Sequence, residues 1–130
     1  MPAKVPGAIL LVDDAPATAL ELALADVAPV QVLRSALAAA RLIGSGAEIA
    51  AVVTDLEMPS LSGFDLIRLV RGDPRHVKTP IVVVSGAVDP DAAERVFALG
   101  ADAYFSKPCS PAEVRRRVEG LINGTRQSDR

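Results

Sequence analysis

Residues 51–63 read AVVTDLEMPSLSG, and this stretch decides the fold of the chain. A short apolar run of strand length delivers a carboxylate, Asp55, to its C-terminal end. Pro59 pushes Met58 out of the α region, so a helix does not start at once, and a turn over residues 60–63 comes first. Ligands of an open α/β sheet lie outside the carboxyl ends of the strands. Asp55 is therefore expected at a functional edge, although a strand-terminal Asp taken alone is equally typical of a loop cap.

Three other strand-like runs end in a polar or charged side chain in the same way. Residues 8–12 lead into Asp13 and Asp14, residues 81–84 into Ser85, and residues 103–106 into Lys107. The first two of these runs are continuously apolar, as is typical of parallel strands that are covered on both faces. This repetition favours the functional interpretation of Asp55.

Strand-like and helical segments alternate along the whole chain. We predict strands at residues 8–12, 30–33, 50–54, 81–84 and 103–106, each followed by a helical pattern. Pro16 and Pro90 are expected in the first turns of their helices, and a capping box with Ser110 and Glu113 is expected to open the last helix. The alternation predicts an α/β fold: a doubly wound, flavodoxin-like, five-stranded parallel sheet with five helices.

The expected strand order is 2-1-3-4-5, which places the ligand crevice between the first and third strands. Those strands end in Asp13, Asp14 and Asp55, so three carboxylates are expected to converge there. Converging like charges require a cation or a proton. Because the donors are hard oxygens with no His or Cys beside them, Mg²⁺ is the expected cofactor. A carboxylate beside Mg²⁺, with Lys107 opposite and the Ser85 hydroxyl near, is the arrangement of a phosphoryl-transfer site.

Composition indicates one globular domain. The chain has 130 residues, of which 50% are hydrophobic and only 3% aromatic, so its core must be built from Val, Leu, Ile and Ala. We expect the domain to cover residues 1–124 and a polar C-terminal tail to follow at residues 125–130.

Charge and cysteine content argue against several classes of protein. With 14 basic and 16 acidic residues the net charge is −2, and no basic cluster stands beside aromatic side chains, so direct nucleic-acid binding is not expected. Neither a signal peptide nor a run of ~20 apolar residues is present, so no membrane association is expected. The single cysteine, Cys109, fits a reducing compartment, and we expect a cytoplasmic location.

At this point the motifs match a family. The chain resembles, over nearly its whole length, the receiver (phosphoacceptor) domain of bacterial two-component response regulators. The matching pieces, each at a predicted strand end or the turn after it, are Leu11-Val12-Asp13-Asp14, Thr54-Asp55-Leu56-Glu57-Met58-Pro59, Gly63, Val84-Ser85-Gly86 and Phe105-Ser106-Lys107-Pro108.

The resemblance implies a role for each site residue. Asp55 becomes the phosphoacceptor and Lys107 the lysine that binds the phosphoryl group. Ser85 and Tyr104 become the hydroxyl and the aromatic ring of a conformational switch. Mg²⁺ would be held by Asp13, Asp14, Asp55 and the main-chain carbonyl of Glu57. The Lys107-Pro108 bond is expected to be cis.

The same resemblance implies the partners. A histidine kinase or phosphotransfer protein would donate the phosphoryl group, and a downstream output domain or protein would respond. The responding surface is expected over residues 90–99, the strand at Tyr104 and residues 111–122, where a homodimer is also expected. Apart from its own phosphorylation and dephosphorylation the protein is not expected to be an enzyme.

Two alternatives remain open at the sequence level. A degenerate receiver would bind its partners without phosphorylation, which the complete set of Asp13, Asp14, Asp55, Ser85 and Lys107 disfavours. A phosphohydrolase of the haloacid dehalogenase type would need Asp-x-Asp after its nucleophilic strand, where this chain has Asp55-Leu56-Glu57. The pattern departs from the family at Ala15-Pro16, where a larger or charged residue usually follows the acidic pair, and at the small Ala87, opposite Glu57. In the family, the side chains at the positions of Glu57 and Ala87 flank the phosphoryl group and tune its lifetime.

Overall fold

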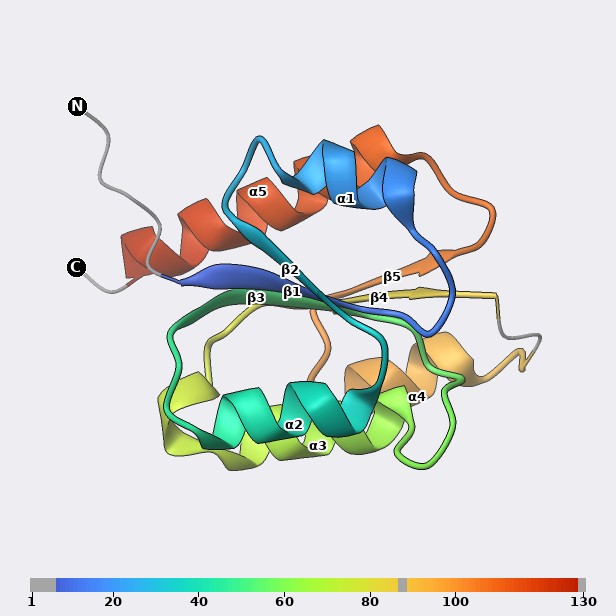
Figure 1. The fold of residues 1–130 in the computed structure, drawn as a ribbon, viewed down its shortest axis with the longest axis horizontal. Helices are drawn as coiled ribbons and strands as arrows, with labels where there is room; N and C mark the ends of the chain where they lie inside the picture. Colours follow the sequence, from blue (N-terminus) through green and yellow to red (C-terminus); the bar gives the residue numbers. More distant parts are fainter. Residues whose placement is uncertain (1–6, 87–88, 129–130) are drawn as a thin grey trace.

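The computed structural model describes residues 7–86 and 89–128, which form a five-stranded sheet between two layers of helices (Figure 1). The elements, in chain order, are β1 (Ala8–Val12), α1 (Thr18–Leu24), β2 (Val30–Leu33), α2 (Ala36–Gly44), β3 (Ile49–Thr54), α3 (Gly63–Gly72), a 3₁₀ turn η1 (Pro74–His76), β4 (Ile81–Ser85), α4 (Ala92–Leu99), β5 (Ala103–Ser106) and α5 (Pro111–Ser128).

The sheet has the predicted topology. Its strand order is β2-β1-β3-β4-β5, and every neighbouring pair is parallel. The first and third strands are therefore adjacent, and Val12 at the end of β1 is in register with Thr54 at the end of β3. This register brings the residues that follow the two strands to the same point of the sheet edge.

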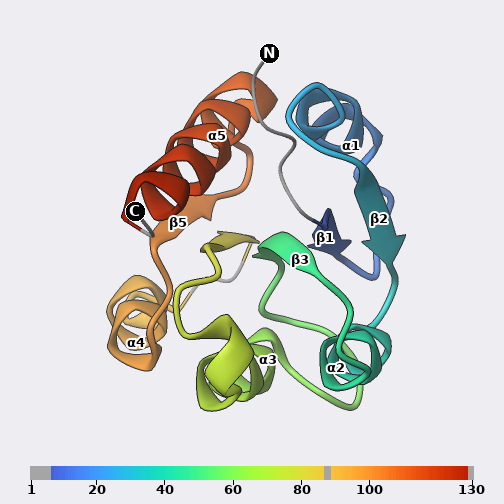
Figure 2. The same cartoon turned by 90° about the vertical axis from the view of Figure 1, so that its left-hand side faces the viewer.

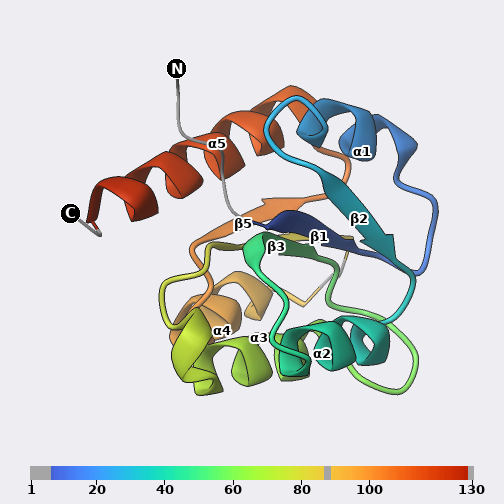
Figure 3. The same cartoon turned by 60° about the vertical axis from the view of Figure 1, so that its left-hand side comes forward.

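Each face of the sheet is buried under its own layer of helices. Figures 2 and 3 show α1 and α5 on one face and α2, α3 and α4 on the other. Successive strand residues alternate between these layers: Leu10 and Val52 pack toward α2, α3 and α4, whereas Ile9 and Val53 pack toward α1 and α5. A fully buried side chain of this kind contributes about 1.5–3 kcal/mol relative to its exposed state. Two-sided burial explains why these strands are continuously apolar.

Helix α1 begins later than its proline predicted. It starts at Thr18, not in the turn around Pro16. The reason is local, because Asp13 Oδ1 accepts a hydrogen bond of 3.0 Å from the Ala15 N–H and bends the chain as it leaves β1.

Helix α4 also begins later than predicted. Its first residue is Ala92, and Asp89 and Pro90 are neither its cap nor its first turn. Asp89 Oδ1 instead accepts from the Asp91 N–H at 2.9 Å, and Asp89 Oδ2 pairs with Arg95 at 3.1 Å. These contacts form a turn ahead of the helix.

The ends of α3 and α5 differ slightly from expectation. A glycine commonly follows the end of a helix, but Gly72 is the last residue of α3 itself, and Asp73 takes the cap position. Helix α5 continues to Ser128, into the range expected to be a tail, so the boundary after residue 124 remains a prediction. Within the described part of the chain, no helix has the length and apolar character needed to cross a membrane.

Arg71 ties several segments together at the sheet edge where the strands begin. Its Nε donates to the Gly100 carbonyl at 2.9 Å, and its Nη1 donates to the carbonyls of His76 and Thr79 at 2.9 and 2.7 Å. Nη2 pairs with Asp102 Oδ2 at 3.0 Å. One side chain thereby fixes the end of α3, η1 and the connection from α4 to β5.

Candidate functional site

Four strands deliver the predicted site residues to one edge of the sheet. Asp13 follows β1, Asp55 follows β3, Ser85 ends β4 and Lys107 follows β5. Because β1, β3, β4 and β5 are consecutive neighbours in a parallel sheet, their carboxyl ends meet. Side chains that are far apart in sequence thus become one cluster.

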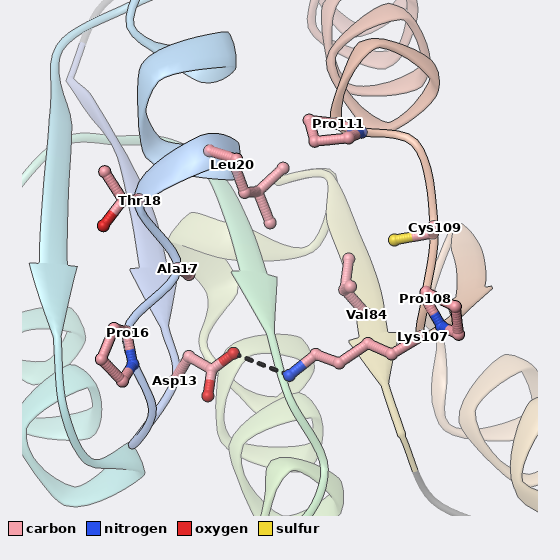
Figure 4. Close-up of a pocket in the computed structure, with 11 residues that line it drawn as sticks. Asp13, Pro16, Ala17, Thr18, Leu20, Val84, Lys107, Pro108, Cys109 and Pro111 are labelled. Carbon is pink, nitrogen blue, oxygen red and sulfur yellow. Dashed lines mark hydrogen bonds and ion pairs between the residues drawn. The ribbon is translucent and has the colours of Figure 1, made fainter.

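Lys107 joins two of the carboxylates directly. Its Nζ donates to Asp13 Oδ2 at 2.9 Å, the ion pair drawn in Figure 4, and to Asp55 Oδ2 at 3.1 Å. Burial by itself lowers the pKa of Lys107. The hydrogen bonds to Asp13 and Asp55 and the charges of both carboxylates outweigh it, so the pKa lies above its ordinary value. The lysine is therefore a fixed positive charge at the acidic cluster. The Lys107-Pro108 bond that follows is cis, as predicted.

Asp13, Asp14 and Asp55 form a group of oxygens with the spacing of a metal site. Each offers one carboxylate oxygen, and these oxygens lie within 4.8 Å of one another. Asp13 is buried, Asp55 half-buried and Asp14 exposed, so the group is open to solvent on one side. Like charges this close favour a bound cation, and an all-oxygen donor set fits Mg²⁺.

The Asp55 side chain is held in one orientation. Its Oδ1 accepts from the Leu56 N–H at 2.6 Å and lies 3.4 Å from the Glu57 N, while its Oδ2 faces Lys107. Thr54, the last residue of β3, donates its hydroxyl to the Asp55 carbonyl at 2.8 Å. The carboxylate is thus presented with one oxygen bound to the backbone and the other directed at the lysine.

Gly63 allows the loop after Asp55 to fold back on itself. Its N–H donates to the Leu56 carbonyl at 2.9 Å, and a Cβ at this position would overlap the Asp55 carbonyl oxygen. Ser62 and Asp65 then form a complete capping box that starts α3. The sequence motif includes Gly63, but the spacing of residues did not show that close packing requires it.

The remaining predicted residues lie around this cluster. Ser85 is fully buried at the end of β4, in register with Ser106 of β5. Tyr104, on β5, is half-buried and packs with the core on the side of α2, α3 and α4. The Glu57 side chain is exposed. Ala87 lies outside the described residues.

A pocket beside the cluster was not expected from the sequence. It has a volume of about 540 Å³ and lies between the start of α1 and the connection from β5 to α5 (Figure 4). Leu20, Val84 and Cys109 line it, with Asp13 and Lys107 at one end. Burial raises the pKa of the Cys109 thiol, so this side chain acts as an apolar part of the wall.

The single histidine of the chain lies away from the acidic cluster. His76 is buried, and its Nδ1 lies 3.0 Å from the Thr79 hydroxyl, at the edge of the sheet opposite Asp55.

Comparison with known proteins gives a consistent family. The family model for the response regulator receiver domain matches residues 9–119. The cell cycle transcriptional regulator CtrA of Caulobacter vibrioides is 34% identical over 71 residues, which are 55% of this chain and 30% of that protein. The matched part of the chain spans only 10% of the length of the protein RcaC of Microchaete diplosiphon and 57% of that of a two-component response regulator of Oryza sativa.

Solved structures share the fold over nearly the whole chain. A response regulator from Chloroflexus aurantiacus, described as putative, is 30% identical with a TM-score of 0.80, covering 91% of this chain and 98% of that one. The receiver domain of a sensor histidine kinase from Pseudomonas aeruginosa is 26% identical with a TM-score of 0.78, over 91% and 98% of the two chains. That structure holds a magnesium ion in its active-site cleft.

Proposed function

The chain belongs to the family of response regulator receiver domains, and we propose that Asp55 is its phosphoacceptor, which receives a phosphoryl group from a histidine kinase in a magnesium-dependent reaction. The observation that carries this proposal is the contact of Lys107 Nζ with both Asp13 and Asp55, at 2.9 and 3.1 Å. It sets a fixed cation beside Oδ2 of Asp55, whose other carboxylate oxygen is held by the backbone of the following loop.

The acidic cluster supports the metal requirement. Asp13, Asp14 and Asp55 would hold Mg²⁺ through their carboxylates and Glu57 through its main-chain carbonyl. The ion would neutralise the charge that builds on the phosphoryl oxygens.

The chain's own residues have separate tasks in the transfer. An oxygen of Asp55 attacks phosphorus as the bond to the leaving group breaks, and the acceptor becomes an aspartyl phosphate. Lys107 pairs with a phosphoryl oxygen and compensates its charge. Ser85 donates its hydroxyl to another phosphoryl oxygen once the group is in place. Tyr104 then turns further into the space beside β4, which changes the surface of α4, β5 and α5.

The partners follow from these roles. A histidine kinase or phosphotransfer protein supplies the phosphoryl group, and an output domain or protein reads the α4-β5-α5 surface, which also serves as a homodimer interface. The half-exposed Phe97 on α4 gives this surface an apolar contact. Beyond its own phosphorylation and dephosphorylation the domain catalyses no reaction. The single free thiol, Cys109, fits a cytoplasmic location.

The function is tested by incubating the protein with acetyl phosphate and Mg²⁺ and measuring the intact mass. We expect one phosphoryl group per chain, lost in Asp55→Asn and in EDTA. Full labelling of Asp55→Asn would contradict the assignment of the acceptor. No labelling of the wild-type chain would favour the degenerate receiver, and turnover of a phosphate ester would favour the phosphohydrolase.

A further inference from the structure

The pocket beside the acidic cluster combines one charged end with apolar walls. Figure 4 shows Leu20 of α1, Val84 of β4 and Cys109 around the same space, with the methylene stem of Lys107 along one side. Val84 is buried, and Leu20 and Cys109 are half-buried. The pocket has a volume of about 540 Å³, which is in the range of small-molecule sites. Such sites are mostly apolar with a few polar groups.

The position of the pocket relates it to the phosphoryl donor. Lys107 belongs both to the pocket and to the acceptor site, because its Nζ contacts Asp55 at 3.1 Å. In an in-line transfer the leaving group departs from the side of phosphorus that faces away from Asp55. The acyl part of a donor whose phosphoryl group contacts Asp55 and Lys107 therefore lies outside the carboxylate cluster, and the side chain of Lys107 connects that cluster to the pocket.

We propose that this pocket binds the acyl chain of a small acyl phosphate, so that the protein prefers donors with short apolar chains over acetyl phosphate. The proposal rests on the proposed function of Asp55. The ammonium of Lys107 complements the anionic phosphoryl head, and the walls complement an alkyl tail. In the reaction the Asp55 oxygen forms a bond to phosphorus, and the bond between phosphorus and the acyl oxygen breaks. The acyl group leaves as a carboxylate with the electron pair, without a proton transfer.

The test compares acetyl phosphate with butyryl phosphate, whose leaving groups are of nearly equal acidity. Each fully buried methylene contributes about 0.8 kcal/mol, and the pocket is open on one side. We therefore expect the second-order rate constant of Asp55 phosphorylation to be about fivefold higher with butyryl phosphate than with acetyl phosphate. Intact mass, followed over time, measures both rate constants.

Two substitutions fill the pocket from opposite walls. Ala17→Leu acts from the start of α1 and Cys109→Leu from the β5–α5 connection. Both are expected to remove the advantage of butyryl phosphate, so that it phosphorylates Asp55 no faster than acetyl phosphate does. Ala98→Leu, on an exposed position of α4 outside the pocket, is the matched control and should keep the fivefold preference. Thermal melting confirms that each variant is folded.

The outcomes separate this inference from the proposed function. The pocket assignment would be overturned if the two donors phosphorylated Asp55 at equal rates and neither filling variant changed these rates. The pocket would then be expected to bind a side chain of a protein donor instead. The function of Asp55 would stand in that case. No phosphorylation by either donor would overturn both.

Discussion

At the scale of single residues, Lys107 forms ion pairs with two carboxylates at the same time. Its side chain is 37% exposed, and those of Asp13 and Asp55 are 8% and 12% exposed. Solvent screens part of the attraction, so the two contacts together contribute modestly to the stability of the folded state. Without the lysine, the carboxylates would face each other with no counter-charge from the chain.

This arrangement predicts that Lys107→Met is less stable than wild type only in the absence of metal. The expected loss in the free energy of unfolding is about 1 kcal/mol in EDTA, because Asp13 and Asp55 then repel. Saturating Mg²⁺ should restore most of it by binding the folded state. Urea unfolding with and without Mg²⁺ measures both values. Equal stability of the two proteins in EDTA would contradict the prediction.

The same contact gives a pH dependence. The folded-state pKa of Lys107 is raised above its ordinary value of 10.5, so its contribution is fully present below about pH 10.5 and is lost as the pH rises through the folded-state pKa. The stability difference between wild type and Lys107→Met should be constant from pH 7 to pH 10 and shrink at higher pH. A difference that grows above pH 10 would contradict this sign.

The two adjacent acidic residues are predicted to behave differently. Asp13 accepts from the Ala15 N–H and from Lys107, whereas the exposed Asp14 has no hydrogen-bond partner among the described residues. Both Asp13→Ala and Asp14→Ala should weaken Mg²⁺ binding by about tenfold or more in calorimetric titration. In EDTA, Asp14→Ala should keep or gain stability because repulsion is relieved. Asp13→Ala should lose about 1–2 kcal/mol with its hydrogen bonds. Equal melting temperatures for the two variants would refute the distinction.

At the scale of elements, the loop from β3 to α3 depends on the missing side chain of Gly63. We predict that Gly63→Ala lowers the free energy of unfolding by about 1–3 kcal/mol and slows phosphorylation, because the new Cβ displaces the Asp55 carbonyl. Gly120→Ala is the matched control. It lies within α5, nothing approaches within 4 Å, and it should stabilise the protein by about 1 kcal/mol through helix propensity. Chemical denaturation of both variants tests the pair.

Comparison of the elements with the sequence shows which features of the fold local patterns predict and which they do not. The strands and their order were predictable because two-sided burial leaves runs such as residues 50–53 continuously apolar. The starts of α1 and α4 were not, because the Asp13 and Asp89 side chains close turns ahead of them. The contacts of Arg71 were also not predictable from local patterns, since two of its partners lie 29 and 31 residues away in the sequence.

The candidate site was more predictable than the details around it. Strand alternation alone sends Asp13, Asp55 and Lys107 to one edge, and the structure brings them into contact. The pocket between α1 and the β5–α5 connection depends on how a helix and a loop lie over the sheet, which no local pattern specifies. The contacts of Asp13, Asp55 and Lys107 are observed, but the roles of these residues, and those of Ser85 and Tyr104, remain predictions.

At the scale of the whole molecule, the proposed function requires a signal to pass from the Asp55 edge to the α4-β5-α5 surface. Ser85 and Tyr104 lie on the neighbouring strands β4 and β5, and Tyr104 is paired in register with Val83. Phosphorylation can shift the population of the active state only by its different affinity for the two states. The contact from the phosphoryl group to Ser85 is the proposed source of that difference.

We therefore predict that Ser85→Ala remains phosphorylated on Asp55 but loses the response of Tyr104. Tyr104 is the only tyrosine and the chain has no tryptophan, so tyrosine fluorescence reports this residue alone. Wild type should change its fluorescence when beryllofluoride and Mg²⁺ are added, and Ser85→Ala should change much less. Equal responses would show that Ser85 does not carry the switch.

The separation of Lys107 from Asp55 has a consequence for protein synthesis. The two residues are 52 positions apart, and Asp13 and Lys107 are 94 apart. A ribosome that adds about 5–20 residues per second makes the lysine roughly 3–10 s after the aspartate. A nascent chain in that interval carries the acceptor without its cation and without β5. Under the proposed function such a chain would be unable to accept a phosphoryl group, and so would a fragment cut before residue 107. The proposed function thus requires translation of β5 and of Lys107 after it before the polypeptide can act as a receiver.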